Sequence, residues 1–215
     1  GWPDIYVACD STPSWLFRNQ RDGTFREEAL ERGIALSEDG MEQAGMGIGV
    51  GDYDLDGNLD IFKTHFSDDT NVLYRNDGKG NFTDVTKECG LAETSMSIKG
   101  AGDVNRDGFP DLFILENKVP QIYLNDGKGR FIKQEGALRG MEKATRPNYS
   151  SWGMAVVVDI DNDGVADILW NGRNFLWALR GAGDGHFDYM NKTWGIKDTS
   201  AASVAIALDE AARTG

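Results

Sequence analysis

Short apolar runs alternate with polar turns rich in aspartate and glycine along this chain, and helical periodicity is weak throughout. In the stretch around residues 46–86 the apolar runs predict four strands, near 46–51, 59–66, 71–76 and 81–86. Only two short stretches, 26–32 and 205–213, have a pattern that a helix would also fit. The pattern therefore predicts an all-β protein.

A hairpin signature recurs along the chain: a short apolar run, a turn containing glycine, and an aromatic residue that begins the next run. It covers residues 16–25, 73–82 and 122–131, with a looser copy at 176–187. A glycine followed by an apolar residue comes after each hairpin, at Gly33, Gly90 and Gly195, with Gly140 a looser match.

These signals divide the chain into repeats of roughly 50 residues, at about 1–45, 46–96, 97–152 and 153–215. Four-stranded units repeated at this length indicate the blades of a β-propeller. We therefore expect residues 1–215 to form a single β-propeller segment.

A nine-residue acidic motif, D-x-[DN]-x-D-G-x-x-D, separates the first two predicted strands of three repeats. A run of charge is usually a solvated surface, but three copies in register argue against that interpretation. Close carboxylates repel one another, and flexible, oxygen-rich, anionic loops are what Ca²⁺ selects. Positions 1, 3, 5 and 9 offer side-chain oxygens, the Gly at position 6 permits a sharp turn, and we expect the carbonyl at position 7 to complete each shell. The predicted ligands of about three Ca²⁺ ions are Asp52, Asp54, Asp56, Asn58 and Asp60; Asp103, Asn105, Asp107, Phe109 and Asp111; and Asp159, Asp161, Asp163, Val165 and Asp167.

The EF-hand shares the opening of this motif but requires a bidentate Glu at position 12, between two helices. Position 12 here is Lys63, Ile114 or Trp170, and the residues after each loop are apolar and aromatic, as in strands. The motif therefore predicts calcium loops that join two β-strands.

The acidic loops and their hairpins resemble FG-GAP/VCBS repeats, the calcium-loop propeller blades also found in integrin α heads. The stretch from Asp10 to Leu91 further resembles the ASPIC/UnbV-type group, the bacterial relatives of cartilage acidic protein. This resemblance rests on four short sequences in the stretch: Leu-Phe-Arg-Asn, Asp-Gly-Thr-Phe, Glu-Gln-Ala-Gly-Met-Gly and Thr-Asn-Val-Leu-Tyr-Arg-Asn-Asp-Gly. The resemblance implies a calcium-stabilised propeller.

The chain also departs from the repeat pattern in three places. Asn105 replaces an Asp at position 3 of the second loop, so this site has one less negative charge and is expected to bind more weakly. Residues 1–4 match 108–111, the last part of a loop, and the stretch from Asp209 begins a further loop that lacks its ligands. We expect a segment of a larger propeller, for example a seven-bladed one; a closed four-bladed ring is the alternative.

The formal net charge is −13, and eleven aspartates of the three loops contribute much of it; three bound Ca²⁺ would reduce it to −7. Nucleic-acid binding is disfavoured, because phosphate requires a basic surface. No apolar run reaches the roughly 18 residues of a membrane span. Reliance on several calcium loops suits an extracellular, cell-surface or periplasmic location, where Ca²⁺ is plentiful.

Two cysteines and three sequons are also relevant to the location of the protein. Cys9 and Cys89 allow at most one disulfide, but they occupy non-equivalent positions, and free thiols are as compatible with the sequence. The sequons begin at Asn81, Asn148 and Asn191; they fit secretion but also occur by chance.

The loops on the face opposite the calcium loops are the expected binding surface, because variable loops on a rigid scaffold usually carry function. Four residues fall at equivalent strand ends on this face: Cys9, His65, Glu116 and Gly172. They are interpreted more simply as strand-end residues than as metal ligands. The Trp-rich stretch 170–177 fits either sugar stacking or a protein contact, or else a core between blades.

The sequence thus predicts a calcium-stabilised interaction module with a protein or carbohydrate ligand, and nothing in it supports catalysis by this segment. Two alternatives stay open: part of an extracellular polysaccharide lyase or hydrolase, and a scaffold subunit of an envelope complex. Fold resemblance alone does not choose among them.

Overall fold

The computed structural model describes residues 2–66, 70–91, 96–116, 119–141, 153–172 and 175–196. These residues form sixteen β-strands and no α-helix, and no helix among them is long and apolar enough to cross a membrane. The all-β prediction is confirmed. Residues 26–32 comprise the end of β3 and the turns after it, so they form no helix despite their weak helical pattern. Residues 205–213 lie outside the described part.

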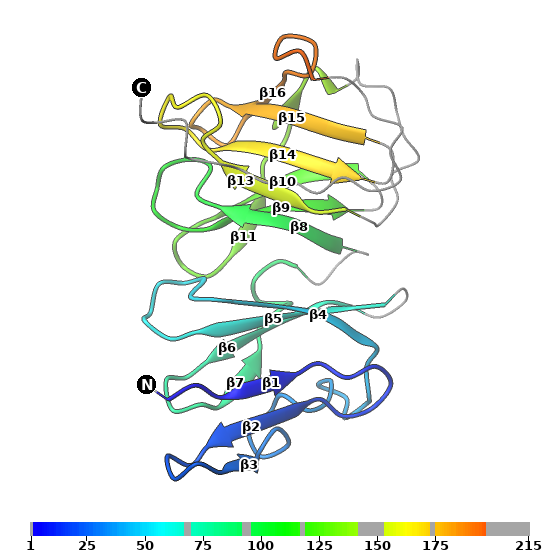
Figure 1. Ribbon diagram of the computed structural model, residues 1–215, viewed down its shortest axis with the longest axis vertical. Helices are drawn as coiled ribbons and strands as arrows, with labels where there is room; N and C mark the ends of the chain where they lie inside the picture. Colours follow the sequence, from blue (N-terminus) through cyan, green and yellow to red (C-terminus); the bar gives the residue numbers. More distant parts are fainter. Residues whose placement is uncertain are drawn as a thin grey trace. The chain divides into compact units, whose positions relative to one another are not determined.

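The strands form four consecutive sheets (Figure 1). The first contains β1 (Ile5–Val7), β2 (Trp15–Asn19) and β3 (Phe25–Glu27). The second contains β4 (Gly45–Gly51), β5 (Asp60–His65), β6 (Val72–Asn76) and β7 (Phe82–Asp84). The third contains β8 (Met96–Gly102), β9 (Asp111–Glu116), β10 (Val119–Asn125) and β11 (Phe131–Lys133). The fourth contains β12 (Leu138–Arg139), β13 (Ala155–Val158), β14 (Asp167–Gly172), β15 (Phe175–Gly181) and β16 (Phe187–Tyr189).

The second sheet has the four strands that the apolar pattern predicts, each within about two residues of its expected bounds. Its strands pair antiparallel in chain order, as in a propeller blade. The first sheet begins at the strand equivalent to β5, and the fourth carries an extra strand, β12, which pairs parallel with β16. That extra strand is not predicted from the sequence, since two residues are too few to give a periodic pattern.

The described residues fall into two compact units. The first comprises residues up to Ser97 together with Asp126–Phe131; the second comprises Ile98–Asn125 and the residues from Ile132 onward. In the first unit, a core of buried side chains from the first two sheets includes Leu16, Ile34 and Tyr74. Burial of these apolar faces is the main force that packs one sheet on the next.

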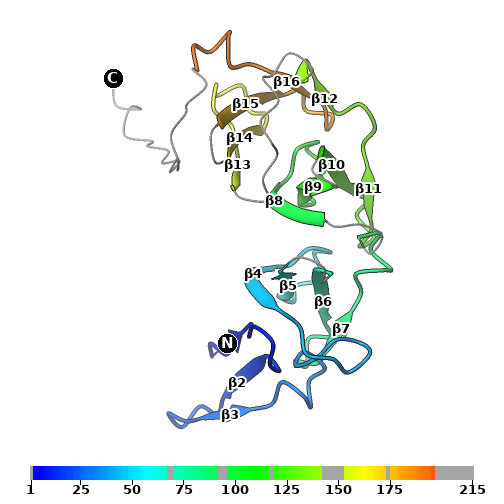
Figure 2. The same ribbon diagram turned by 90° about the vertical axis from the view of Figure 1, so that its right-hand side faces the viewer.

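The core of the second unit is more aromatic. Trp170, Phe175 and Trp177 lie within 5.2 Å of one another by ring centroids, and Trp170 also contacts Phe113 edge to face at 5.2 Å. Both views of the ribbon show β9 and β10 side by side with β14 and β15 (Figure 2). Trp170 and Trp177 are buried between these sheets, so of the two interpretations of this stretch the core is correct, and these rings cannot stack on a sugar. Arg173 and Asn174 lie outside the described residues.

The glycine after each hairpin lies in a turn, and the turns at Gly33 and Gly90 precede the next sheet along the chain. Gly33, Gly90, Gly140 and Gly195 all have positive φ. In the first unit the turn also pairs with a later strand, because the N–H of Phe82 donates to the carbonyl of Arg32 at 2.8 Å. A Cβ on Gly33 would lie 2.6 Å from the carbonyl oxygen of Phe82. Glycine is therefore needed here for both conformation and space.

Candidate metal centre

The three acidic loops each join the first two strands of a four-stranded repeat, as predicted; in the fourth sheet these strands follow the extra strand β12. Residues 52–59 connect β4 to β5, residues 103–110 connect β8 to β9, and residues 159–166 connect β13 to β14. Position 9 of each motif is the first residue of the second strand. Position 12 is the fourth residue of that same strand and is buried in all three, which confirms that the loops are not EF-hands.

The same backbone network shapes all three loops. The carboxylate at position 1 accepts the N–H groups of positions 5 and 6, through Asp52 at 3.0 and 2.9 Å, Asp103 at 3.1 and 2.9 Å, and Asp159 at 3.1 and 2.9 Å. The carboxylate at position 5 accepts the N–H of position 7, at 2.8 to 2.9 Å. These bonds curl the loop around its carboxylates and use one oxygen of the position 5 residue.

Two positions of each loop adopt left-handed backbone conformations. The glycines at position 6 have φ between 81° and 90°. Position 4 also has positive φ, at Leu55 (56°), Arg106 (65°) and Asn162 (61°). This conformation is uncommon for a bulky residue such as leucine. The sequence gives no signal at position 4, because three unrelated residue types stand there.

The aspartate at position 9 ties the loop to the hairpin of the same sheet. Asp60 accepts the N–H of Tyr53 at 3.2 Å and the N–H of Asn76 at 2.9 Å. Asp111 and Asp167 make the equivalent pairs of bonds, to Val104 and Asn125 and to Ile160 and Gly181. All three carboxylates are at most 1% exposed.

Burial makes these position 9 carboxyls hard to ionise. It raises the pKa of Asp60 to about 6, against the opposing effect of the two N–H donors, and the pKa of Asp111 likewise to about 6. The pKa of Asp167 is raised for the same reason. Nearby loop aspartates add to the effect, so each site concentrates negative charge that a cation would stabilise.

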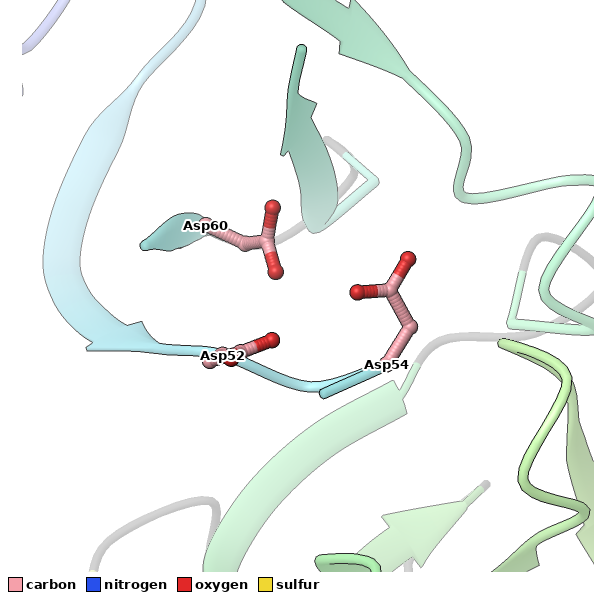
Figure 3. Close-up of side chains that lie close together, drawn as sticks. All are labelled: Asp52, Asp54 and Asp60. Carbon is pink, nitrogen blue, oxygen red and sulfur yellow. The ribbon is translucent and has the colours of Figure 1, made fainter. Parts of the chain in front are cut away.

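Two of the loops bring three carboxylates together. One oxygen each from Asp52, Asp54 and Asp60 lie within 4.8 Å of one another, and Figure 3 shows these side chains converging on one space. Asp159, Asp161 and Asp167 form the equivalent group in the third loop. Asp56 and Asp163, at position 5, lie outside these groups. The second loop has no such trio because Asn105 stands at position 3; the amide of Asn105 donates to Asp107 at 2.9 Å.

The third loop differs from the first in its basic neighbours. The guanidinium of Arg180, in β15, donates from Nε to Asp161 Oδ2 at 2.6 Å and from Nη2 to Asp163 Oδ2 at 2.5 Å. Arg106 of the second loop donates to the carbonyl of Gly164 at 2.6 Å. Neither arginine stands out in the sequence. Arg180 is 19 residues from Asp161 along the chain, and Arg106 belongs to the preceding repeat.

Asp4 occupies the position of the ninth loop residue in the first sheet, as the match of residues 1–4 to 108–111 predicts. It accepts the N–H of Asn19 at 2.8 Å, and the amide of Asn19 donates to the carbonyl of Pro3 at 3.2 Å. Asn76 and Asn125 make the same two bonds in the next sheets. The hairpin asparagine is thus part of the repeat.

The remaining sequence candidates have ordinary structural surroundings. Cys9 and Cys89 are both free, and the Cys89 thiol is buried 3.6 Å from the hydroxyl of Tyr53. Glu116 is paired with Lys133 at 3.0 Å and accepts the hydroxyl of Tyr123 at 3.1 Å. Of the sequons, Asn81 is exposed and Asn148 lies outside the described residues.

The side chain of Asn191 is buried and hydrogen-bonds to the backbone through both its amide and its oxygen. Its amide donates to the carbonyl of Leu176 at 2.7 Å, and its oxygen accepts the N–H of Ala178 at 2.8 Å. In this fold, that sequon cannot accept a glycan.

Comparison with known proteins agrees with this repeat architecture. A family model described as an FG-GAP-like repeat matches three overlapping stretches, residues 1–63, 52–114 and 103–170. Cartilage acidic protein 1 from Xenopus tropicalis, Mus musculus and Homo sapiens is 26% identical over 176 residues. These matches cover 77% of this chain and 26%, 26% and 25% of the respective relatives, so the chain spans about a quarter of their length. Both resemblances drawn from the sequence are confirmed.

A solved structure shares the fold. It is described as specific recognition of non-reducing terminal N-acetylglucosamine by an Agrocybe aegerita lectin, and it matches with a TM-score of 0.51 and 23% identity. The match covers 86% of this chain and 46% of the lectin chain. At this identity the likeness shows the fold alone.

Proposed function

Because the chain belongs to the FG-GAP-like repeat family, we propose that it is a calcium-stabilised, β-propeller-like module that binds other molecules outside the cytoplasm. The observation that carries the metal part of this proposal is the convergence of Asp52, Asp54 and Asp60 (Figure 3). In this proposal the four repeats, 1–45, 46–96, 97–152 and 153–215, act as one structural module.

The residues present fit a hard, oxygen-seeking cation. Three carboxylates within 4.8 Å of one another, one of them buried, form a donor set of oxygens without nitrogen or sulfur. In the first loop Asp52, Asp54 and Asp60 would hold the ion, with Asp56 and the carbonyl of Asn58 as the further expected ligands. The ion would neutralise the loop carboxylates and fix the connection between the first two strands.

Calcium would act on stability through linkage. A cation that binds the folded loop and not the unfolded chain stabilises the fold by about 2.7 kcal/mol per site at a hundredfold excess over Kd. Two or three such sites are a large part of the usual domain stability of about 5–15 kcal/mol. A protein that depends on weak calcium sites suits a compartment with millimolar Ca²⁺, which supports the extracellular or periplasmic location.

For the binding role we propose the loops opposite the calcium loops, presenting a surface to a protein or carbohydrate ligand. The repeat family, and a lectin that shares the fold, support this choice of function class. The terminal N-acetylglucosamine named for the lectin is a reasonable first carbohydrate probe, to be tested beside other glycans.

The test is a calcium titration of the purified chain, followed by thermal melting from an EDTA baseline. We expect a Ca²⁺-specific rise in Tm, with Mg²⁺ much less effective because it demands a stricter octahedral shell. The same protein is then applied to an array of glycans in Ca²⁺ and in EDTA. No rise in Tm would remove the metal role, and turnover of a polysaccharide would replace the interaction module by an enzyme.

A further inference from the structure

The three acidic loops face different residues at one equivalent position, in β6, β10 and β15. Arg180, Arg75 and Leu124 each precede the residue whose N–H donates to the buried aspartate of the loop: Gly181 to Asp167, Asn76 to Asp60, and Asn125 to Asp111. These three side chains therefore start from the same place relative to their loops.

Only one of the three side chains is bound to its loop among the described residues. Arg180 contacts Asp161 and Asp163 at once, at 2.6 and 2.5 Å. Arg75 attracts Asp54 electrostatically but forms no ion pair within 4.0 Å in the described part of the chain. Leu124 has no charge to offer.

Arg180 contacts the oxygen of Asp163 that does not accept the N–H of Val165, and a cation bound by Asp163 would compete for that oxygen. Asp163 Oδ1 accepts the N–H of Val165 at 2.9 Å, so Oδ2 is the less engaged oxygen, and Arg180 Nη2 lies on Oδ2. In the first loop Asp56 Oδ1 likewise accepts the N–H of Asn58, but no guanidinium contacts its Oδ2 in the described residues.

We propose that Arg180 is a built-in counter-ion of the third loop, which neutralises Asp161 and Asp163 in place of a cation and competes with Ca²⁺ for their oxygens. This inference rests on the proposed calcium role of the loops. It makes the first loop the tightest site. Asn105 lowers the calcium affinity of the second loop by removing a negative charge, and Arg180 lowers that of the third loop by competing for its oxygens.

Arg106 supports the same assignment. Its guanidinium donates to the carbonyl of Gly164, at position 6 of the third loop, so a second positive charge lies against this loop. A loop with two arginines in contact depends less on a cation to hold its shape than the first loop does.

The experiment compares the whole chain with R180L, which installs the leucine found at the equivalent position 124, and with R75L as the matched control. Calcium binding is measured by isothermal titration calorimetry, and thermal melting is measured in EDTA and in saturating Ca²⁺. The ion pairs are partly exposed, with 44% of the Arg180 side chain and 28–29% of the aspartate side chains accessible, and such pairs are individually weak. We therefore expect R180L to tighten one calcium site by roughly three- to thirtyfold.

The melting data provide the second readout. R180L should lower Tm in EDTA, because Asp161 and Asp163 lose their counter-ion, and should match the wild type in saturating Ca²⁺, which also shows that the variant folds. R75L should change the calcium affinity and the Tm in EDTA less than R180L does. Addition of D163A to R180L should abolish the gain in affinity.

Two results would overturn the assignment. Weaker calcium binding in R180L would mean that the arginine orients the carboxylates for the ion, and equal effects of R180L and R75L would mean that only overall charge matters. If the wild type binds no Ca²⁺ while R180L alone is destabilised in EDTA, the proposed calcium function fails and the counter-ion role stands.

Discussion

Asp56 and Asp60 are both aspartates of the first loop, yet their surroundings give them different roles. Asp56 lies near the surface and accepts one N–H within the loop. Asp60 is 1% exposed and accepts two N–H groups, one from the loop and one from the end of β6. Asp56 is expected to matter mainly through a bound cation, and Asp60 both through a bound cation and through the metal-free fold.

Substitution of these two residues separates the roles. Asp56→Ala should remove about 2–3 kcal/mol of stability in excess Ca²⁺ and change stability in EDTA by less than about 0.5 kcal/mol. Asp60→Asn should cost about 1–3 kcal/mol in EDTA, because the new amide group faces an N–H donor, and should cost more in excess Ca²⁺, because it also replaces a proposed ligand. Urea unfolding in each buffer measures both. Equal losses in the two buffers for Asp56→Ala would exclude its role as a metal ligand.

The buried carboxyls also predict how calcium binding depends on pH. The pKa of Asp60 and of Asp111 is raised to about 6 in the metal-free fold, whereas an unfolded aspartate titrates near 3.9. Between these values the fold binds more protons than the unfolded chain, so metal-free stability falls as pH rises from about 4 to 6.

Calcium needs the ionised carboxylates, so protons compete with it below pH of about 6. We expect apparent calcium affinity to fall between pH 7 and pH 5, by up to about tenfold per pH unit for each proton displaced. Titration calorimetry in buffers of different ionisation enthalpy would count these protons. Affinity that does not change over this range would contradict the raised pKa values as the controlling factor.

At the scale of the element, two kinds of contact beyond strand pairing fasten the described sheets. The position 9 aspartate ties the acidic loop to the hairpin, and the turn after the hairpin ties one sheet to a strand of the next. The turn at Gly33 shows the second device, since its neighbour Arg32 accepts the N–H of Phe82. In both devices the donors are backbone N–H groups, so the donor positions tolerate varied side chains.

Two glycines with positive φ test the importance of this turn. Gly33 has φ 76° and a Cβ there would lie 2.6 Å from the carbonyl of Phe82, whereas Gly23 has φ 91° and open space around it. Gly23→Ala should cost about 1–2 kcal/mol for backbone strain alone. Gly33→Ala should cost roughly 3 kcal/mol or more, because the overlap adds to the strain. Equal losses in urea unfolding would show that the close contact is unimportant.

For the molecule as a whole, charge is the dominant feature. The net charge is −13, and eleven aspartates stand in three short loops. Self-repulsion of this kind opposes the compact state. Bound cations would relieve it at the loops, where the charge is most concentrated.

Salt should therefore substitute in part for calcium. In EDTA, an increase of NaCl from about 0.01 to 0.5 M shortens the screening length from roughly 30 Å to a few ångströms and should raise Tm by several degrees. In saturating Ca²⁺ the same change should have little effect. Differential scanning calorimetry with a matched sucrose series would separate screening from general stabilisation. An identical salt response in both buffers would argue that the loops are not where the repulsion lies.

By itself the sequence determined the strand order, the loops between the first and second strands, and the residues that meet at Asp52, Asp54 and Asp60, because these features depend on short-range spacing. Only the tertiary structure decided the contacts between distant residues. It buried Trp170 and Trp177 in a core, tied Asn191 to the backbone, placed Arg180 on Asp161 and Asp163, and put Asp60 on the N–H of Asn76. Whether an aromatic or an amide is exposed, or which arginine reaches an aspartate 19 residues away, depends on how sheets pack and strands register, which local spacing does not encode.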